Sequence, residues 1–401
     1  MQARARVPAH MPHMPGWLAF SLVVLLILSG LGYRLVSLDS SSRPHIELTS
    51  LQTPAPAPVL PPVTVPSGVR DAVTAWILDA QDPTGAIVMT PGSDRVVPYF
   101  ANMAALAVLP EYPDAARRYM DWYFAHLNHP DKYGLDGTIY DYFLYDGTPV
   151  STGDYDSADS YAATFLILAS RYAAVTGNTN YVRAHLGDLN AMAGVILRLQ
   201  DADGLVWAKS NFRMKYIMDN AENYRGLMDW AYTLRQLGMA SQAQVFEAAA
   251  ARVQAGINSL WDSNHATFAY EVTIFGLRRY ANASRWYPDV PAMLFPFLYG
   301  VFPASDPRAV LVYQAVNLAH PGWPQRIDSA QPWAPAAYMS VLLGDQGTAS
   351  VALATAADLG PAGGSNWQIN EAAFVLFALD AMTGATPAVQ PAVALPPAPA
   401  R

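Results

Sequence analysis

Three aspartates, Asp154, Asp156 and Asp159, stand at the start of a long apolar stretch that ends near Thr176. The free N–H groups and the positive dipole of a helix N-terminus favour acids there. A helix that is apolar on every side is buried on every side, so carboxylates at its mouth must be paired, hydrated or used. Ser157 or Asp156 can cap this helix. The alternative interpretation is that one acid is only a cap and that the others are solvated loop residues.

Acid and base catalysis, as in glycoside hydrolysis, is one chemistry that a pair of carboxylates can perform. One carboxyl must be protonated to donate to the leaving oxygen, and another must be ionised to activate water or attack the sugar. Glu222 is the candidate acid, because it stands in a turn that would be half-buried, where desolvation raises a carboxyl pKa. It could instead be a first-turn acid that suits the helix dipole. Asp289 is the candidate base, with Asp156 in reserve; the alternative is that Asp289 is an ordinary residue of the turn between Pro288 and Pro291.

The elements that must position these residues alternate along the chain. Segments with one charged face are followed by segments apolar on nearly every face, as a closed ring of helical hairpins requires. The expected outer helices are Val69–Gln81, Pro113–Asn128, Asn180–Gln200, Ser241–Leu260, Pro307–Leu318 and Gln346–Leu359. The expected inner helices are Tyr99–Leu109, Ser157–Thr176, Asn220–Leu237, Pro291–Val301, Pro335–Leu343 and Glu371–Met382.

Short loops that begin with Asp and follow outer helices recur at Asp82, Asp201 and Asp262, which favours one array over several unrelated domains. The predicted fold is therefore an all-α (α/α)6 toroid over residues 67–384. Other helical arrays fit the same count.

In such a ring, the loops that lead into the inner helices gather at one end. Acids and aromatic residues would meet there, as in a sugar cleft, where rings stack on pyranose faces and carboxylates bind hydroxyls. Besides the catalytic candidates, the predicted substrate-binding residues are Asp154, Asp159, Tyr99, Asp219, Asn220, Tyr224, Trp286, Tyr287, Trp333, Trp367, Asn370 and Glu371. Each of the tryptophans could instead belong to the core, and Glu371 could be a structural first-turn acid.

The helix rhythm, together with the motifs at 156–162 (DSADSYA) and 219–224 (DNAENY), resembles the six-hairpin glycosidases. The motifs look like the starts of the fourth and sixth helices in these α/α-toroid enzymes, which act on polysaccharides. The resemblance covers roughly residues 67–384 and implies the fold and a glycosidase activity.

Within that group, the pattern is similar to the endoglucanases of glycoside hydrolase family 8. That resemblance implies that Asp159 binds substrate, that Asp289 in Tyr287-Pro288-Asp289 is the base, and that the enzyme inverts. The family's general-acid Glu before the second helix is missing, since residues 96–100 read VVPYF. Either the acid comes from Glu222 or Glu371, or the chain belongs to another family on the same ring.

The composition excludes several other classes of function. The net charge of −8, with scattered Lys and Arg, argues against a nucleic-acid groove. There is no Cys, no HExxH pattern and no histidine at the start of an inner helix, so neither a zinc site nor a His-based epimerase or lyase is expected. We expect no metal and no cofactor.

The N-terminal region contains an uncharged apolar run at 17–33, about the minimum length for a spanning helix. We expect an uncleaved single-pass anchor with residues 1–16 cytoplasmic; a cleaved signal peptide is the alternative. The Pro- and Ser-rich segment 34–66 would be a semi-rigid linker, and residues 385–401 a Pro- and Ala-rich tail.

Together these features predict a glycoside hydrolase at the cell membrane, with its domain outside the cytoplasm. It would act on a polysaccharide or oligosaccharide and could work with exopolysaccharide synthesis machinery. The alternative is a non-catalytic glycan-binding or scaffold protein of an exopolysaccharide assembly system.

Overall fold

The computed structural model describes residues 60–325, 333–359 and 367–384, all within one compact unit, Ala55–Arg401. The predicted anchor at 17–33, the tail at 385–401 and most of the predicted linker lie outside the described residues. Within the described ranges, none of the helices combines the length and the apolar character needed to cross a bilayer.

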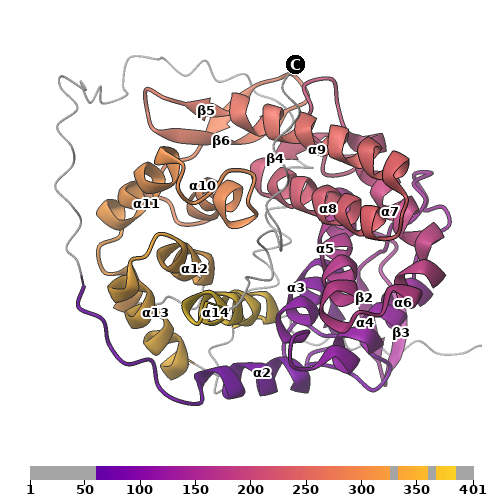
Figure 1. Cartoon of the computed structure of the whole chain (residues 1–401), viewed down its shortest axis with the longest axis horizontal. Helices are drawn as coiled ribbons and strands as arrows, with labels where there is room; N and C mark the ends of the chain where they lie inside the picture. Colours follow the sequence, from indigo (N-terminus) through magenta and orange to yellow (C-terminus); the bar gives the residue numbers. More distant parts are fainter. Residues whose placement is uncertain (1–59, 326–332, 360–366, 385–401) are drawn as a thin grey trace, which may run out of the picture. The chain divides into compact units, whose positions relative to one another are not determined.

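Helices make up most of the described chain and form two concentric layers (Figure 1). The outer helices are α2 (Val69–Asp79), α4 (Pro113–Ala125), α6 (Thr179–Ala184), α7 (Leu186–Leu199), α9 (Ala240–Ser259), α11 (Pro307–Ala319) and α13 (Gln346–Leu359). The inner helices are α3 (Pro98–Val108), α5 (Ala158–Thr176), α8 (Ile217–Gln236), α10 (Asp289–Leu298), α12 (Ala334–Leu342) and α14 (Ile369–Met382). The single outer helix expected over 180–200 is two helices, α6 and α7, which meet at His185.

The inner helices close into a ring. Helix α3 contacts α5, and the contacts continue through α8, α10, α12 and α14 back to α3. Burial follows this arrangement, since every residue of α10 is buried, whereas α4 buries one face only. The predicted toroid of six hairpins is therefore confirmed for the described part of the chain.

The recurring loop that follows an outer helix is a structural repeat. The Nε2 group of Gln81 donates to the carbonyl oxygens of Gly85, at 3.1 Å, and Ala115, at 2.9 Å. In the same way, Gln200 donates to Gly204, at 2.8 Å, and Ala249, at 3.0 Å. Each loop is thereby fixed to the next outer helix.

The glycine of each loop is required by both conformation and space. Gly85 and Gly204 have φ values of +101° and +87°, a region that L side chains rarely adopt. A Cβ at Gly204 would also lie 2.2 Å from the carbonyl oxygen of Arg252, and one at Gly85 2.4 Å from that of Arg118. The close approach of loop and helix therefore explains the Gly in both copies.

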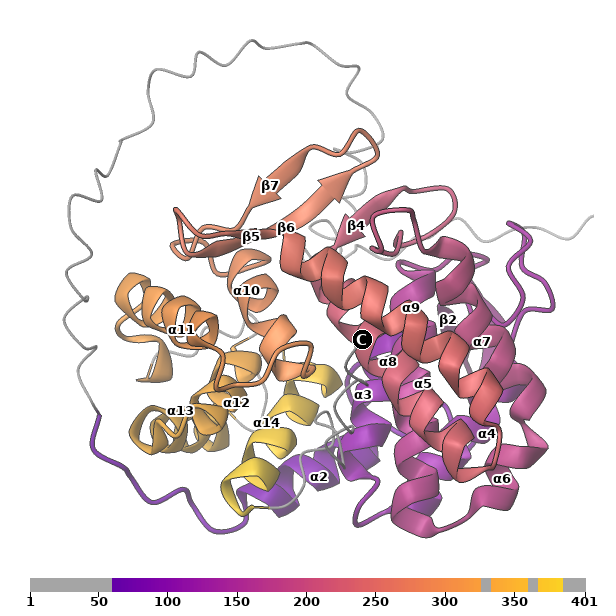
Figure 2. The ribbon, with the colours of Figure 1, turned by 45° about the horizontal axis from the view of Figure 1, so that its top comes forward.

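The expectation of an all-α fold is wrong in one respect, because two small antiparallel sheets accompany the helices. One contains β1 (Arg95–Val96), β2 (Tyr142–Tyr145) and β3 (Thr148–Ser151) in that order. The other contains β4 (Met214–Tyr216), β5 (Trp261–Asp262), β6 (Thr267–Thr273) and β7 (Arg278–Tyr280). Central strand β6 pairs with the other three, and β6 and β7 form a ribbon outside the ring of helices (Figure 2). Strands this short give too few alternating residues to stand out in the sequence.

Candidate functional site

Ser157, just before α5, contacts acids at the start of both α5 and α8. Ser157 Oγ lies 2.6 Å from Asp159 Oδ1 and 2.9 Å from Asp219 Oδ2. Although Ser157 is the N-cap residue of α5, its side chain does not cap the helix, which corrects one interpretation of the sequence. The hydroxyl instead joins two carboxyl groups from neighbouring inner helices.

The hydroxyl of Ser157 has a single proton, so it cannot donate to both carboxyl groups. Asp159 already accepts from Asn223 Nδ2, at 2.6 Å, and from the backbone N–H of Ser160, at 2.8 Å, which favours its ionised form. We therefore assign the Ser157 proton to the contact with Asp159. The contact between Ser157 and Asp219 then needs a proton on Asp219, which donates to Ser157 Oγ.

The electrostatics agree with this assignment. Burial raises the pKa of Asp159 to about 7, opposed by its bonds to Ser157, Asn223 and Ser160. The pKa of Asp219 is raised well above its usual value, first by burial and then by the negative charges of Asp159 and Glu222. Asp219 is half-buried, whereas Asp159 is sealed from solvent, so Asp219 is the one of these two that a ligand can reach.

Glu222 interacts electrostatically with both of these acids and has only 1% of its surface exposed. Tyr99 donates to its Oε1 at 2.7 Å, and Ser160 makes a short hydrogen bond to its Oε2. Tyr299, at the end of α10, interacts with the same carboxyl group. Burial raises the pKa of Glu222 to about 8. The structure thus gives Glu222 the raised pKa predicted for a general acid, but in a closed position.

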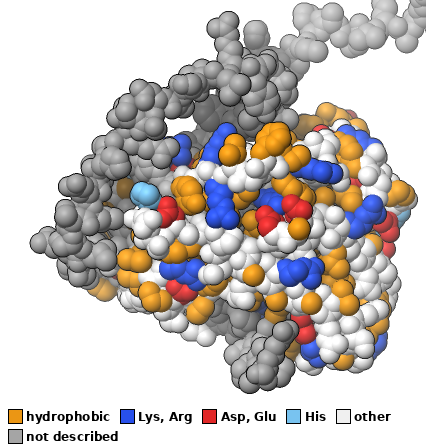
Figure 3. All heavy atoms as spheres, turned by 90° about the horizontal axis from the view of Figure 1, so that it is seen from above, with side chains coloured by type: hydrophobic (Ala, Val, Ile, Leu, Met, Phe, Trp, Pro, Cys, Tyr) orange, Lys and Arg blue, Asp and Glu red, His pale blue; other side chains and the backbone are white. Residues whose placement is uncertain are grey.

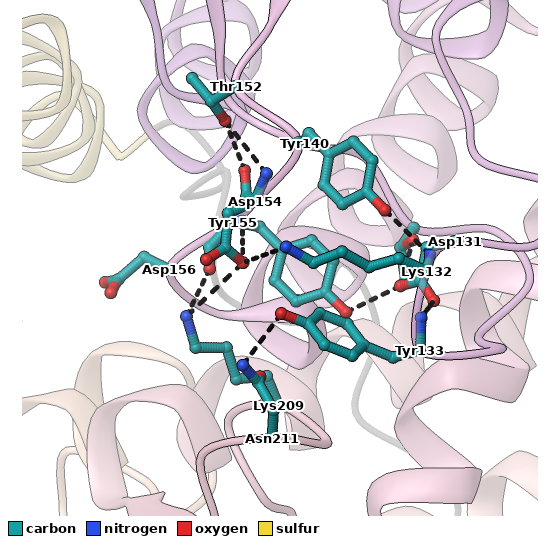
Figure 4. A network of polar contacts seen from close by, with 12 residues as sticks. Asp131, Lys132, Tyr133, Tyr140, Thr152, Asp154, Tyr155, Asp156, Lys209 and Asn211 are labelled. Carbon is teal, nitrogen blue, oxygen red and sulfur yellow. Dashed lines mark hydrogen bonds and ion pairs between the residues drawn. The ribbon is translucent and has the colours of Figure 1, made fainter. Parts of the chain in front are cut away.

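Asp156 is exposed at the rim, and Figure 4 shows its side chain pointing away from the neighbouring polar network. Asp156 contributes to the raised pKa of Asp219, so the two carboxyl groups lie within electrostatic range. Asp154 points the other way, towards Lys132 Nζ at 4.0 Å and Lys209 Nζ at 3.9 Å (Figure 4). Of the three acids in the opening motif, one is buried, one faces lysines and one is open to solvent.

A tyrosine cluster borders this rim. Tyr155 stacks on Tyr140 with ring centroids 5.6 Å apart, and its hydroxyl donates to Asp131 at 2.7 Å (Figure 4). Lys132 Nζ lies 4.9 Å from the centroid of the Tyr133 ring. None of these residues except Tyr155 stands in the predicted motif, so the sequence reading missed the cluster.

Asp289 is buried in the first turn of α10, beside α8 in the ring. Its Oδ1 accepts from the Asn282 N–H and from Arg285, both at 2.7 Å, and its Oδ2 has no hydrogen-bond partner in the described ranges. Tyr287, two residues earlier, is 60% exposed and lies in electrostatic range of Asp219. Trp286 packs instead against Trp323, with ring centroids 5.9 Å apart.

A second carboxyl site lies across the ring, at the starts of α12 and α14. Glu371 Oε2 accepts from the Ala334 N–H at 3.1 Å, and burial raises the pKa of Glu371 to about 8. Within the part of the chain that the structure describes, three buried atoms here have no hydrogen-bond partner: Trp367 Nε1, Asn370 Oδ1 and Glu371 Oε1. The rings of Trp333 and Trp367 are buried and stack on each other at 6.0 Å, so neither presents the open face expected of a sugar platform.

Two more predicted residues lie on α8. The side-chain oxygen of Asn220 accepts from the Val206 N–H at 2.7 Å, and its amide donates to the Val206 carbonyl at 3.1 Å. Both bonds hold the repeated loop against α8, which leaves the Asn220 side chain occupied. Tyr224 is half-buried against the core, and burial raises its pKa.

The sequence reading missed several residues that shape the site. Ser157, Ser160 and Tyr299 bind the predicted acids directly, and Asp141 binds the Tyr161 hydroxyl at 2.8 Å and Arg95 at 3.2 Å. The two serines stand inside the motif that opens α5, so their spacing to Asp159 was a usable signal. Tyr299 ends an apolar helix and carries no such signal.

Comparison with known proteins shows the fold. No protein-family profile and no curated protein matches the sequence. Among solved structures, a glycosidase variant in complex with glucose is similar with a TM-score of 0.56 and 14% identity, over 79% of this chain and 97% of that one. A mannosylglycerate hydrolase of glycoside hydrolase family 63 from Thermus thermophilus is similar with a TM-score of 0.54 and 13% identity, over 79% of this chain and 99% of that one.

A bacterial glucoamylase complexed with acarbose is similar with a TM-score of 0.56 and 14% identity, over 80% of this chain and 56% of the glucoamylase chain. The chain therefore has the helical toroid fold of these glycosidases. Its likeness to family 8 in particular stays a prediction.

Proposed function

We propose that this protein is a glycoside hydrolase in which Asp219 is the general acid and Asp156 activates water. The observation that carries the proposal is Ser157, whose single hydroxyl proton lies between Asp159 and Asp219 and so keeps a proton on Asp219. A carboxyl group that stays protonated near neutral pH is what protonation of a leaving glycosidic oxygen needs. The similarity to three kinds of glycosidase in fold adds support.

We assign the role of general acid to Asp219 rather than to Glu222 because Asp219 is more exposed to solvent. Glu222 is closed in by Tyr99, Ser160 and Tyr299, so a ligand cannot reach its carboxyl group, whereas Asp219 is half-buried. Asp156 takes the role of base because water can reach it, whereas Asp289 is buried and bonded to Arg285. The expected inversion requires the two carboxyl groups to be about 6.5–9.5 Å apart across a bound sugar.

The proposed substrate is a polysaccharide or oligosaccharide, met outside the cytoplasm by a domain tethered through residues 17–33. The similar structures include a glucoamylase and a mannosylglycerate hydrolase, and they hold acarbose or glucose. A substrate panel should therefore contain maltooligosaccharides, mannosylglycerate, β-glucans and exopolysaccharides. A role beside exopolysaccharide synthesis machinery is part of the same proposal.

The test is sugar release from this panel by the full chain and by Asp219→Asn, Asp156→Asn and Asp289→Asn. We expect wild-type release on at least one substrate and a loss in the first two variants. Asp71→Asn, an exposed acid on outer helix α2, is the matched control and should keep full activity. Undiminished release by Asp219→Asn would refute the assignment. Retained glycan binding with no release by the wild type would instead favour the non-catalytic binding protein.

A further inference from the structure

Three large apolar side chains that are more than half exposed lie together at the tip of the β6–β7 ribbon. Phe275 is 80% exposed, Leu277 is 66% exposed and Ile274 is 52% exposed. A soluble surface carries single apolar residues without consequence, but three large ones within a four-residue loop are a binding feature. We call residues 274–277 the apolar tip.

The apolar tip is an ordered turn. The Thr273 N–H donates to the Leu277 carbonyl at 2.9 Å, and the Gly276 N–H donates to the Thr273 carbonyl at 2.9 Å. Gly276 has a φ of +74°, which lets the chain reverse at this point. The side chain of Phe275 is thus presented by hydrogen-bonded backbone.

Basic residues surround the tip. Arg278 and Arg279 follow it directly and are exposed, and Arg213 precedes β4, whose Met214 pairs with Thr273 at the same end of the sheet. Residues 209–216 and 272–280 contain five cationic residues, in a chain whose net charge is −8. Three of them lie near acids, since Lys215 is buried against Asp201 and Asp203, Lys209 lies near Asp154, and Arg279 pairs with Glu271 at 3.0 Å. Arg213 and Arg278 are the exposed cations on which the charge of this end of the sheet depends. The face seen in Figure 3 shows hydrophobic and basic side chains next to each other, with some acidic side chains between them.

We propose that the apolar tip docks on an anionic membrane surface. Aromatic and aliphatic side chains partition into the boundary between headgroups and acyl chains, and a collar of arginines is attracted to anionic lipid. The same chain carries the uncharged apolar run at 17–33, joined to the domain by the Pro- and Ser-rich segment, so a bilayer is the surface this domain would meet first. The proposal does not depend on the glycosidase function.

The sequence makes a site-specific test simple because the chain contains no cysteine. The full chain with Leu277→Cys is labelled with an environment-sensitive fluorophore and reconstituted into vesicles. One set of vesicles is phosphatidylcholine alone and the other has equal parts of phosphatidylcholine and phosphatidylglycerol. The matched control is Leu318→Cys on α11, where the side chain is 77% exposed and lies away from the arginine collar in sequence.

We expect the label at position 277 to shift to the blue and to be quenched by a lipid-borne quencher in the anionic vesicles, with the label at 318 unchanged. Phe275→Asp should abolish the shift. Arg213→Gln and Arg278→Gln should each lower the ratio of inserted to free tip roughly fivefold in anionic vesicles only. Because all variants keep residues 17–33, the comparison isolates the tip.

Three outcomes would overturn the proposal. Equal responses of the two labels would mean that the tip has no preference for lipid. Protection of the 277 label that grows with protein concentration, independent of lipid, would make the tip a contact between copies of the chain. Protection that depends on neither lipid nor concentration would mean that the tip packs on its own domain.

Discussion

Two walls of the ring hold buried glutamates with the same pKa of about 8, Glu222 on α8 and Glu371 on α14. Their surroundings differ. Both oxygens of Glu222 accept from hydroxyl groups, whereas Glu371 interacts with the backbone of Ala334 and Trp333, and its Oε1 has no hydrogen-bond partner among the described residues. One raised pKa therefore belongs to a complete network and the other to a site that lacks a partner, so a pKa alone does not locate the chemistry.

The largest expected effect is on enzyme kinetics, which should distinguish the α8 wall from the α14 wall. Asp219→Asn removes the proton donor, and we expect kcat to fall about 10²- to 10⁴-fold, the usual contribution of a general acid. Glu371→Gln should leave kcat and KM little changed, since Glu371 and the unpartnered atoms beside it are buried. Steady-state kinetics on one substrate decide; a comparable fall of kcat in both variants would erase the distinction.

The next effect concerns stability. Glu222→Ala leaves the hydroxyls of Tyr99 and Ser160 without their acceptor and opens a cavity, so the free energy of unfolding should fall by about 3 kcal/mol. Glu371→Ala leaves the Ala334 N–H unpaired, and a smaller loss of about 1–2 kcal/mol is expected. Denaturant unfolding measures both values. The reverse order would show that the α14 wall is the better packed one.

A third effect is the dependence of stability on pH. Both glutamates have folded pKa values of about 8 against an ordinary 4.5, so the folded state binds protons that the unfolded state has released. Their contribution is present below pH 4.5 and is lost as the pH rises through about 8, so Tm should fall across this window. Glu222→Gln and Glu371→Gln should each flatten the curve, and an unchanged slope in both would contradict the assigned burial.

The smallest expected effect is the loss of stability when one hydroxyl group, that of Ser160, is removed. Ser160→Ala removes one of the bonds to Glu222 and leaves the bond from Tyr99, so the free energy of unfolding should fall by about 1 kcal/mol. The same variant should move the pH dependence of Tm towards higher pH, because a bond that lowers the pKa of Glu222 is lost. A shift in the opposite direction would show that Ser160 does not donate to the carboxylate.

The fold was largely readable from the sequence because the two helix layers differ in polarity. The apolar run after Asp159 and the half-polar run after Pro113 follow directly from whether a helix touches neighbours on all sides or on one. The Asp-x-x-Gly loops were readable as a repeat, although only coordinates show that Gly85 and Gly204 meet backbone oxygens. Strands of two to seven residues left no comparable pattern.

The site was less readable, since ranking the acids requires their burial. Asp156, Asp159, Asp219 and Glu222 all stand in the predicted motifs, and the sequence offers no reason why Glu222 is sealed while Asp219 is half-open. That difference arises from Tyr99 on α3, far away along the chain, whose hydroxyl covers Glu222. Contacts between helices distant in sequence decide which carboxyl group a ligand reaches.

The pairing of β4 with β6 fixes how far the candidate acids lie from the apolar tip. Tyr216, just before α8, pairs with Glu271, four residues before Phe275, so the acids stand about 13 Å along the strand from the loop that would rest on lipid. If the apolar tip rests on the bilayer and the acids cut glycans, a glycan would be cut only at about this distance from the bilayer. Extending both strands of the ribbon by two residues would raise the cut by about 7 Å, so the ladder would act as a gauge of product length.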